Sequence, residues 1–304
     1  MSVVFATLFN SLYLLQGVAL VESLIRNYPE SKILISPLDD LTSETLFQKF
    51  KSSKNVFIDN ETIRQSYERR LRNQEKINEV IFSLKPILIK NAMKSLQGDM
   101  YFYCDADLYF FNRFNFDAIS EEMILTEHIF KSELFEHVKY GQYNAGFLGF
   151  SKSPSSLACL TWWAKKCKES TANNIENGVM GDQKYLERFF EFTPSIKVIK
   201  SPTMNQSVWM LDEKLTISQG PMIDGNLVSS FHFHRLKPYK RVFKTGINQY
   251  GKARGRSELF RAIYQPYLMQ LRAHNDIIKI MGLSSPKVKF AELKRFEWSI
   301  NKWA

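Results

Sequence analysis

Two aspartates at one end of an apolar run are the residues of this sequence best suited to chemistry. Asp105 and Asp107 follow the run Met-Tyr-Phe-Tyr-Cys at positions 100–104, which has the length and composition of a buried strand. Side chains at i and i+2 of an extended chain point the same way, so both carboxylates could bind one Mg²⁺ or Mn²⁺ ion that neutralises a diphosphate. An Asp-x-Asp triplet also arises by chance on the order of once in such a chain, usually in a surface turn. The buried strand before it favours the metal site.

A second segment with ligand chemistry lies at residues 231–239, which read Phe-His-Phe-His-Arg-Leu-Lys-Pro-Tyr. His232 and His234 alternate there, and imidazole is a natural further ligand for a Mn²⁺ ion already held by carboxylates. A histidine that stands alone is more often structural than a ligand. Lys237, directly before Pro238, could contact a phosphate, although lysine in a surface turn is common.

Two further segments could contact a sugar. Residues 140–150 hold three glycines and Asn144 among aromatic residues, which suits either a sugar-binding surface or a glycine-containing core strand. Asp182 follows Gly181 at the expected start of a helix, where an N-cap is the ordinary explanation for an aspartate. The sequence contains no P-loop, no G-x-G-x-x-G motif and no spacing that singles out a nucleophile, which leaves the metal site as the chemistry.

These residues need a framework that brings them together, and the apolar pattern predicts one. Strands are expected at 3–9, 32–36, 56–58, 100–104 and 123–126. Helices are expected over 14–26, over 61–97 with a break at Pro86, and over 156–168 and 258–281. This alternation predicts an α/β fold with a doubly wound, mostly parallel sheet flanked by helices. Ligands of such sheets bind beyond the carboxyl ends of the strands, where Asp105 and Asp107 would lie.

Composition is that of a globular protein in a reducing compartment. The 304 residues are 44% hydrophobic and can bury a full core. Three cysteines, Cys104, Cys159 and Cys167, are too few and too irregularly spaced for a disulfide framework. The sequence shows no basic leader, no cleavage site and no run of the roughly 18 apolar residues that a membrane span needs. We therefore expect a cytoplasmic protein.

The net charge of +10 is concentrated at the C-terminal end, because Lys and Arg far outnumber Asp and Glu after residue 230. We divide the chain into a catalytic domain, 1–239, and a basic extension, 240–304, with a loop over 240–257 followed by C-terminal helices. Residues 289–303 carry an apolar stripe with basic residues elsewhere, as a helix at an anionic membrane surface would, although such a helix more often docks on its own domain. A location at the inner face of the membrane predicts that deleting residues 286–304 abolishes liposome binding, and unchanged binding would count against it.

Six short segments occur in a particular order along residues 6–238. They are Ala-Thr-Leu-Phe-Asn-Ser-Leu-Tyr-Leu (6–14), Phe-Ser-Leu-Lys-Pro (82–86), Tyr-Cys-Asp-Ala-Asp (103–107), Tyr-Asn-Ala-Gly-Phe (143–147), Gly-Asp-Gln (181–183) and His-Phe-His-Arg-Leu-Lys-Pro (232–238). The ordered set resembles the nucleotide-diphospho-sugar glycosyltransferases of the GT-A fold, and most closely the family 8 type. Two departures matter. Arg235 stands where that family usually has glycine, with one residue fewer before Lys237, so the two histidines compete as metal ligand. Lys184 replaces the acid expected after Asp-Gln, which weakens the sugar-binding role of that segment.

The resemblance implies roles for the matching residues. It places Thr7 and Asn10 near the nucleotide base, Asp39 or Asp40 near the base or ribose, and Lys85 near the donor sugar or its phosphates. The residues implied for donor, metal and diphosphate binding further along the chain are Asp105, Ala106, Asp107, His232 (with His234 as the alternative metal ligand) and Lys237. The residues implied for catalysis are Asp182 and Gln183, and those implied for sugar or acceptor contacts are Tyr143, Asn144, Ala145 and Gly146.

The implied activity is metal-dependent transfer of a hexose from a nucleoside-diphosphate sugar, expected to be a UDP-sugar, to a hydroxyl of a glycan or lipid-linked acceptor. The family favours retention of configuration, and the setting would be bacterial surface polysaccharide synthesis. Mn²⁺ or Mg²⁺ would stabilise the departing diphosphate. A metal-dependent nucleotidyltransferase is the alternative enzyme. A nucleic-acid-binding module would use the basic tail without the aspartates, although no nucleic-acid partner is expected.

Overall fold

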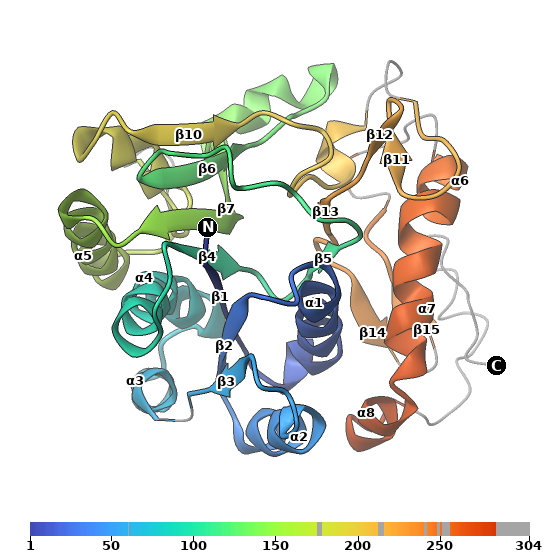
Figure 1. The fold of residues 1–304 in the computed structure, drawn as a ribbon, viewed down its shortest axis with the longest axis horizontal. Coiled ribbons are helices and arrows are strands. Elements are labelled where there is room, and N and C mark those ends of the chain that lie inside the picture. The colour runs from blue at the N-terminus through green and yellow to red at the C-terminus, as the bar shows by residue number, and fades with distance from the viewer. Residues whose placement is uncertain are drawn as a thin grey trace.

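A seven-stranded sheet runs through the centre of the computed structural model, with helices on both sides (Figure 1). The structure describes residues 1–59, 61–174, 178–211, 216–239, 242–247, 250 and 256–283. In spatial order the strands are β10 (Ile196–Ile199), β6 (Met123–Glu127), β7 (Tyr143–Ser151), β4 (Met100–Cys104), β1 (Val3–Phe9), β2 (Lys32–Pro37) and β3 (Val56–Ile58). Of these seven, β7 is antiparallel to its neighbours β4 and β6, and the other pairings are parallel. The predicted α/β fold is confirmed.

The strands are apolar throughout because both faces of the sheet are covered. In β1, Phe5 packs in one apolar core while its neighbours Val4 and Ala6 pack in the other, as the two-residue period of a strand requires. The first core includes α1 (Leu14–Asn27), and the second includes α4 (Ile77–Ser95) and α5 (Pro154–Glu169). Near-continuous apolar runs of this kind are typical of central strands in a parallel sheet.

The helices differ from the prediction at one proline. The helix expected over 61–97 is two helices, α3 (Thr62–Arg72) and α4, and the chain turns between them at Gln74, whose φ of 62° is left-handed. Pro86 lies inside α4 and does not end it. Leu84 and Leu88, the buried residues before and after the proline, pack α4 against the sheet. This packing keeps the segment helical although Pro86 cannot donate a backbone hydrogen bond.

The remaining elements are short. The other helices are α2 (Asp40–Phe50), α6 (Arg256–Leu259), a π-helical turn (Phe260–Tyr264), α7 (Gln265–Ala273), α8 (Asn275–Ile280) and the 3₁₀ helices η1 (Ser11–Tyr13), η2 (Ser132–Tyr140), η4 (Lys184–Glu191) and η5 (Val208–Met210). Two-stranded pairs join β5 (Leu108–Phe110) to β13 (Ser230–His232), β14 (Lys237–Tyr239) to β15 (Val242–Lys244), β11 (Met222–Ile223) to β12 (Asn226–Leu227), and β8 (Asn173–Asn174) to β9 (Val179–Met180).

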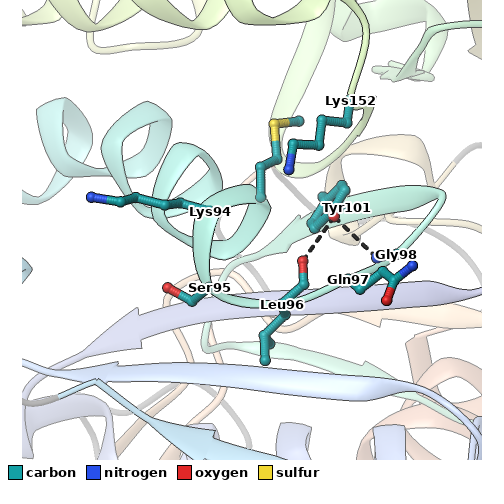
Figure 2. Close-up of a pocket in the computed structure, with 8 residues that line it drawn as sticks. Lys94, Ser95, Leu96, Gln97, Gly98, Tyr101 and Lys152 are labelled. Carbon is teal, nitrogen blue, oxygen red and sulfur yellow. Dashed lines mark hydrogen bonds between the residues drawn. The ribbon is translucent and has the colours of Figure 1, made fainter.

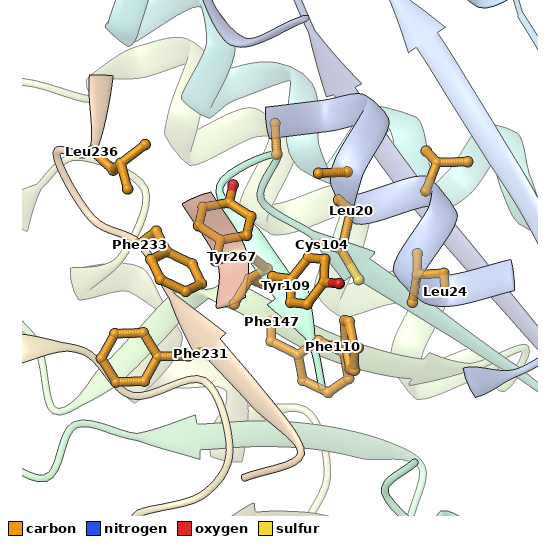
Figure 3. Packing of buried hydrophobic residues seen from close by; sticks show 14 of the residues in the cluster. Leu20, Leu24, Cys104, Tyr109, Phe110, Phe147, Phe231, Phe233, Leu236 and Tyr267 are labelled. Atoms are coloured by element: carbon orange, nitrogen blue, oxygen red, sulfur yellow. The ribbon is translucent and has the colours of Figure 1, made fainter. Parts of the chain in front are cut away.

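The C-terminal helices pack on α1 and on the segment that follows β13 (Figure 3). Phe233 stacks on Tyr267 of α7, with ring centroids 3.8 Å apart. The domain boundary after Tyr239 stays a prediction, and it falls within the β14–β15 hairpin. Residues 242–244 form a strand where a loop was expected, because they pair with β14. The helix predicted at 289–303 lies outside the described residues. Within the described ranges, no helix is both long and apolar enough to cross a membrane.

Candidate active site

One edge of the sheet collects most of the polar residues that the sequence singled out. Asp105 directly follows β4, and the carboxyl ends of the parallel strands β1, β6 and β10 lie at the same edge. Because β7 runs in the opposite direction, its first residues, including Asn144 and Gly146, also lie there. The backbone N–H of Asp105 donates to the carbonyl of Gly146 at 2.8 Å. This is the edge at which α/β sheets bind ligands.

Asp105, Asp107 and His232 form a cluster at this edge. The β5–β13 pairing places His232 opposite Leu108, and the N–H of Phe233 donates to the carbonyl of Asp107 at 2.8 Å. His232 Nε2 lies 3.1 Å from Asp107 Oδ1 and 4.0 Å from Asp105 Oδ2. One donor atom from each residue falls within 4.8 Å of the others. Two carboxylates and one imidazole are a donor set that suits Mn²⁺ or Mg²⁺, so these residues could hold a divalent ion.

The pKa shifts of the cluster show that its members interact electrostatically. Burial alone lowers the pKa of the His232 imidazole, but the negative charges of Asp107 and Asp105 outweigh it, so the pKa is raised. Burial alone raises the pKa of Asp107, but its interaction with His232 holds the pKa below its usual value. A bound cation would take the place of the proton between them.

His234 lies apart from the two carboxylates. Its ring centroid is 6.0 Å from that of His232, and the indole of Trp209 packs edge-on against both rings at 5.8 and 5.9 Å. Burial and the nearby His232 charge lower the pKa of His234 to about 4. Phe233, between the two histidines, points into the core. The strand β13 ends at His232 and the chain turns at His234 and Arg235, where the φ of Arg235 is 62°, so His234 leaves the alternation that would have put it on the same side as His232. Within the described residues, the geometry brings His232 to the aspartates, and His234 does not reach them.

Lys85 is a buried charge beside this cluster. Its Nζ lies 3.2 Å from Asp105 Oδ1 and 3.0 Å from Asp182 Oδ2, and it donates to the carbonyl of Ala145 at 3.3 Å. It also lies over the ring of Tyr103 at 4.9 Å. Burial alone lowers the pKa of Lys85, but the two carboxylates raise it overall. An ammonium group has three hydrogens, and each has an acceptor here.

Asp182 is the partner of Lys85 and not a helix cap. η4 begins two residues later, and its N-terminal residue Gln183 makes no capping side-chain bond, so the N-cap interpretation of Asp182 is wrong. Burial raises the pKa of Asp182, and the charge of Lys85 opposes this shift. The Asp182 carbonyl accepts from Trp163 Nε1 at 3.1 Å, which fixes the backbone at this point. Lys85 and Asp182 are 97 positions apart in the sequence, so sequence analysis could not reveal this ion pair.

The start of β7 forms a tight polar surface next to the cluster. Asn144 Oδ1 accepts from the N–H of Gly146 at 2.8 Å. A Cβ atom at Gly146 would lie 2.7 Å from His232 Cε1, so only glycine lets the imidazole approach this closely. Gln183 Oε1 accepts from the N–H of Ala145 at 3.5 Å. The predicted sugar contacts therefore lie against the cluster, with Tyr143 at the beginning of the strand and largely buried.

The residues predicted for the nucleotide are distributed unevenly. Thr7 is buried, and its hydroxyl has no hydrogen-bond partner within the described ranges. Asn10 donates to the Tyr67 hydroxyl at 3.2 Å, and Asp39 caps α2 and accepts from the N–H of Ser11 at 2.7 Å. Asp40 is 81% exposed and pairs with Arg64 on α3. Of the two acids, Asp39 faces the end of β1 and Asp40 points away from it.

Two more predicted residues have simple positions. Ala106 is buried between the two aspartates, and Lys237 is exposed at the start of β14. The carbonyl of Leu236 accepts from Gln16 Nε2 at 3.1 Å, which ties this segment to α1. Lys237 is therefore held at its backbone by the β14–β15 pairing, and its side chain is exposed.

Two tyrosines that the sequence did not single out also lie at the site. Tyr103 donates to Asp105 Oδ1 at 2.6 Å, an i, i+2 contact that the alternation of a strand could have suggested. Tyr13, in η1 before α1, lies near the cluster. Burial and the negative charges of Asp107 and Asp105 raise the pKa of its phenol. Its proximity depends on the tertiary fold, so no local pattern indicates it.

A separate cavity of about 500 Å³ lies at the amino-terminal end of β4 (Figure 2). The Tyr101 hydroxyl donates to the carbonyl of Leu96 at 2.9 Å and accepts from the N–H of Gly98 at 3.0 Å. Lys94 and Lys152 also line this cavity. It lies at the opposite edge of the sheet from Asp105 and takes no part in the candidate active site.

Comparison of the sequence with known proteins gives two relatives. YfnF of Bacillus subtilis (strain 168) is 26% identical over 247 residues, which cover 77% of this chain and 81% of YfnF. YfnD of the same strain is 21% identical over 291 residues, or 90% of each chain. Both are uncharacterized proteins. No protein-family model matches the sequence.

Solved structures show the fold. The apo form of the glycosyltransferase GlyE from Streptococcus pneumoniae TIGR4 superposes with a TM-score of 0.52 at 14% identity, over 93% of this chain and 62% of GlyE. The galactosyltransferase LgtC, in complex with donor and acceptor sugar analogs, gives a TM-score of 0.50 at 14% identity, over 97% of this chain and 100% of LgtC. This chain thus has the GT-A architecture that the segments of the sequence predicted.

Proposed function

We propose that this chain is a metal-dependent glycosyltransferase. It transfers a hexose from a nucleoside-diphosphate sugar, which we take to be a UDP-sugar, to a hydroxyl of a glycan or lipid-linked acceptor, with retention of configuration as in family 8. The observation that carries the proposal is the cluster of Asp105, Asp107 and His232 at the ligand-binding edge of a GT-A sheet. The galactosyltransferase activity named for LgtC, which shares the fold, supports it.

The residues of the chain divide the work in this proposal. A divalent ion held by Asp105, Asp107 and His232 would supply positive charge for the departing diphosphate. Lys237 adds a flexible cation that can contact the same phosphates. Lys85 acts as a positioning residue, because its three hydrogens are already directed at Asp105, Asp182 and the Ala145 carbonyl.

The sugar would lie over the start of β7. Gly146 leaves room for a close approach to the backbone, and Asn144 fixes the loop through its side-chain oxygen. Asp182 and Gln183 are the residues that we assign to the sugar hydroxyls, and Gln183 contacts this strand at the N–H of Ala145. Burial of these groups gives a site in which polar contacts are stronger than they would be in water.

Release of nucleoside diphosphate from a panel of UDP- and GDP-sugars, with and without Mn²⁺, tests the proposal. The Asp107→Asn variant should lose metal-dependent release by about a hundredfold or more, because a charged metal ligand is removed. Asp276→Asn on α8, an exposed aspartate outside the site, makes the same chemical change and should behave as wild type. Undiminished release in Asp107→Asn would refute the metal assignment. Transfer of the nucleoside monophosphate to an acceptor, with release of the sugar 1-phosphate, would identify a nucleotidyltransferase instead.

A further inference from the structure

A second group of side chains lies at the same sheet edge and takes no part in the metal cluster. The segments that follow β6 and β10 meet there, where the N–H of Lys131 donates to the carbonyl of Trp209 at 3.0 Å. At the other end of η2, Gln183 Nε2 donates to the carbonyl of Tyr140 at 3.3 Å. The helix η2 is thus anchored at one end beside Trp209 and at the other beside Gln183.

Five rings form a connected surface between these anchors, and we call them the aromatic wall: Phe130, His137, Tyr140, Trp209 and Tyr250. His137 is the central ring, with centroid distances of 5.2 Å to Tyr140, 5.9 Å to Phe130 and 6.0 Å to Tyr250. Tyr250 reaches Trp209 at 6.5 Å. Because Trp209 also packs against His232, the wall is continuous with the candidate metal centre.

Four of the five rings differ from a core cluster in their exposure, whereas Trp209 is buried and joins the wall to the core. Phe130, His137, Tyr140 and Tyr250 are only partly buried. Phe135, on the same helix η2, is 72% exposed, the largest exposed fraction among the large hydrophobic residues of the described chain. Exposed aromatic surface beside a polar site marks a binding surface more often than a structural one.

The charges around the wall indicate what kind of ligand it fits. Lys131 pairs with Glu133 at 3.2 Å, and Lys139 lies over the Tyr140 ring while Glu136 is exposed on the same helix. Positive and negative charges therefore balance along residues 131–140, which gives no preference for an anion. Phenol and imidazole edges offer hydrogen bonds around apolar ring faces, and this combination matches a pyranose, whose C–H face is apolar and whose rim carries hydroxyls.

We propose that the aromatic wall, together with Phe135, binds a neutral pyranose ring of the acceptor. The inference rests on the proposed glycosyltransferase function, and it adds the chemical class of the acceptor and the segment that selects it. The wall holds this ring next to the metal centre, with Trp209 as the boundary between acceptor and donor. Specificity for the acceptor would then depend on η2 and Tyr250, and donor binding would depend on Asp105, Asp107 and His232.

Saturation-transfer difference NMR on the full chain in Mg²⁺ tests this binding without requiring turnover. The probes are the methyl β-glycosides of glucose, galactose and N-acetylglucosamine. We expect at least one to bind, and its dissociation constant to rise about three- to tenfold in Tyr140→Ala, because one stacked ring is lost. Tyr140→Phe keeps the ring and should bind nearly as well as wild type. Phe47→Ala, which removes an exposed phenylalanine from α2, should have no effect.

Phe135→Ala provides a second variant that is safe for folding, since the side chain is already exposed. The proposal is overturned if none of the three glycosides binds, or if Tyr140→Ala and Phe135→Ala both bind them as wild type does. Failure here is separable from failure of the proposed function. If the glycosides bind but no metal-dependent diphosphate release is found, the acceptor-binding role of the aromatic wall stands and the glycosyltransferase proposal fails. If diphosphate is released but no glycoside binds, the glycosyltransferase proposal stands and the role of the wall fails.

Discussion

Replacing Lys85 with methionine should destabilise the protein strongly, because it leaves Asp182 charged and unpaired in the interior. The two side chains are 3% and 4% exposed, and Nζ lies 3.0 Å from Asp182 Oδ2. Removing one partner of such a pair costs about 3–5 kcal/mol, since the remaining charge is buried without compensation. A domain of ordinary stability unfolds with only about 5–15 kcal/mol, so Lys85→Met should be marginally folded.

A double-mutant cycle separates this charge effect from lost packing. In Lys85→Met with Asp182→Asn, neither partner is charged, so the double variant should be less destabilised than the sum of the two single variants. We expect a coupling free energy of about 1–3 kcal/mol. The contact of Lys85 with Asp105 contributes less to the free energy of unfolding than the contact with Asp182, because the Asp105 carboxylate is 25% exposed and is screened by water.

Urea unfolding followed by tryptophan fluorescence, in EDTA to exclude metal ions, measures all four free energies of unfolding. Lys90→Met is the matched control: it lies on the same helix, and its ammonium group donates to the Thr161 hydroxyl near the surface. This control should change the unfolding free energy by no more than about 0.5 kcal/mol. The reasoning fails if Lys85→Met costs no more than Lys90→Met, or if the coupling falls below about 0.5 kcal/mol.

Two further predictions concern a glycine and a glutamate. Gly146→Ala should weaken Mn²⁺ binding by about tenfold or more, because the new Cβ would lie 2.7 Å from His232 Cε1 and displace this imidazole. Mn²⁺ titration followed by electron paramagnetic resonance measures the affinity, and a wild-type affinity in the variant would contradict this prediction. Burial raises the pKa of Glu22, but His274, 3.1 Å away, and Lys49 outweigh it and hold the pKa below its usual 4.5. A carboxylate with a lowered folded-state pKa stabilises the fold above the unfolded value and loses this contribution as the pH falls through the folded value. Glu22→Gln should therefore lose less unfolding free energy than wild type between pH 6 and about pH 3, and equal losses in urea titrations would refute this.

The sequence predicted what depends on local pattern. Apolar runs located β1, β2, β3, β4 and β6, because strands buried on both faces need uninterrupted apolar residues. Asp105 stood out because a carboxylate at the end of such a strand is costly without a partner. The sequence left residues 140–150 open between a sugar-binding surface and a core strand. The structure makes 143–151 the strand β7, an antiparallel central strand whose first residues face the site.

Other features depend on contacts between distant segments, and no local pattern reveals them. A lysine before a proline in a helix resembles a surface residue, and only the fold shows that Lys85 is enclosed by Asp105 and Asp182. The choice between His232 and His234 followed from the pairing of β13 with β5, which decides which histidine faces Asp107. The direction of β7 depends on the connection through η2, which returns the chain beside β6.

The pairing of β5 with β13 has a mechanical consequence. A cation that bridges Asp107 and His232 would act as a reversible cross-link between the central sheet and the segment packed under α7. It would close the long chain loop between these two residues, and its binding free energy would add to the stability of that closure. Loss of the ion would loosen β13 first, because this strand has only three residues in its ladder. Metal occupancy would thus strengthen one of the two contacts of the C-terminal helices, the other being their packing on α1.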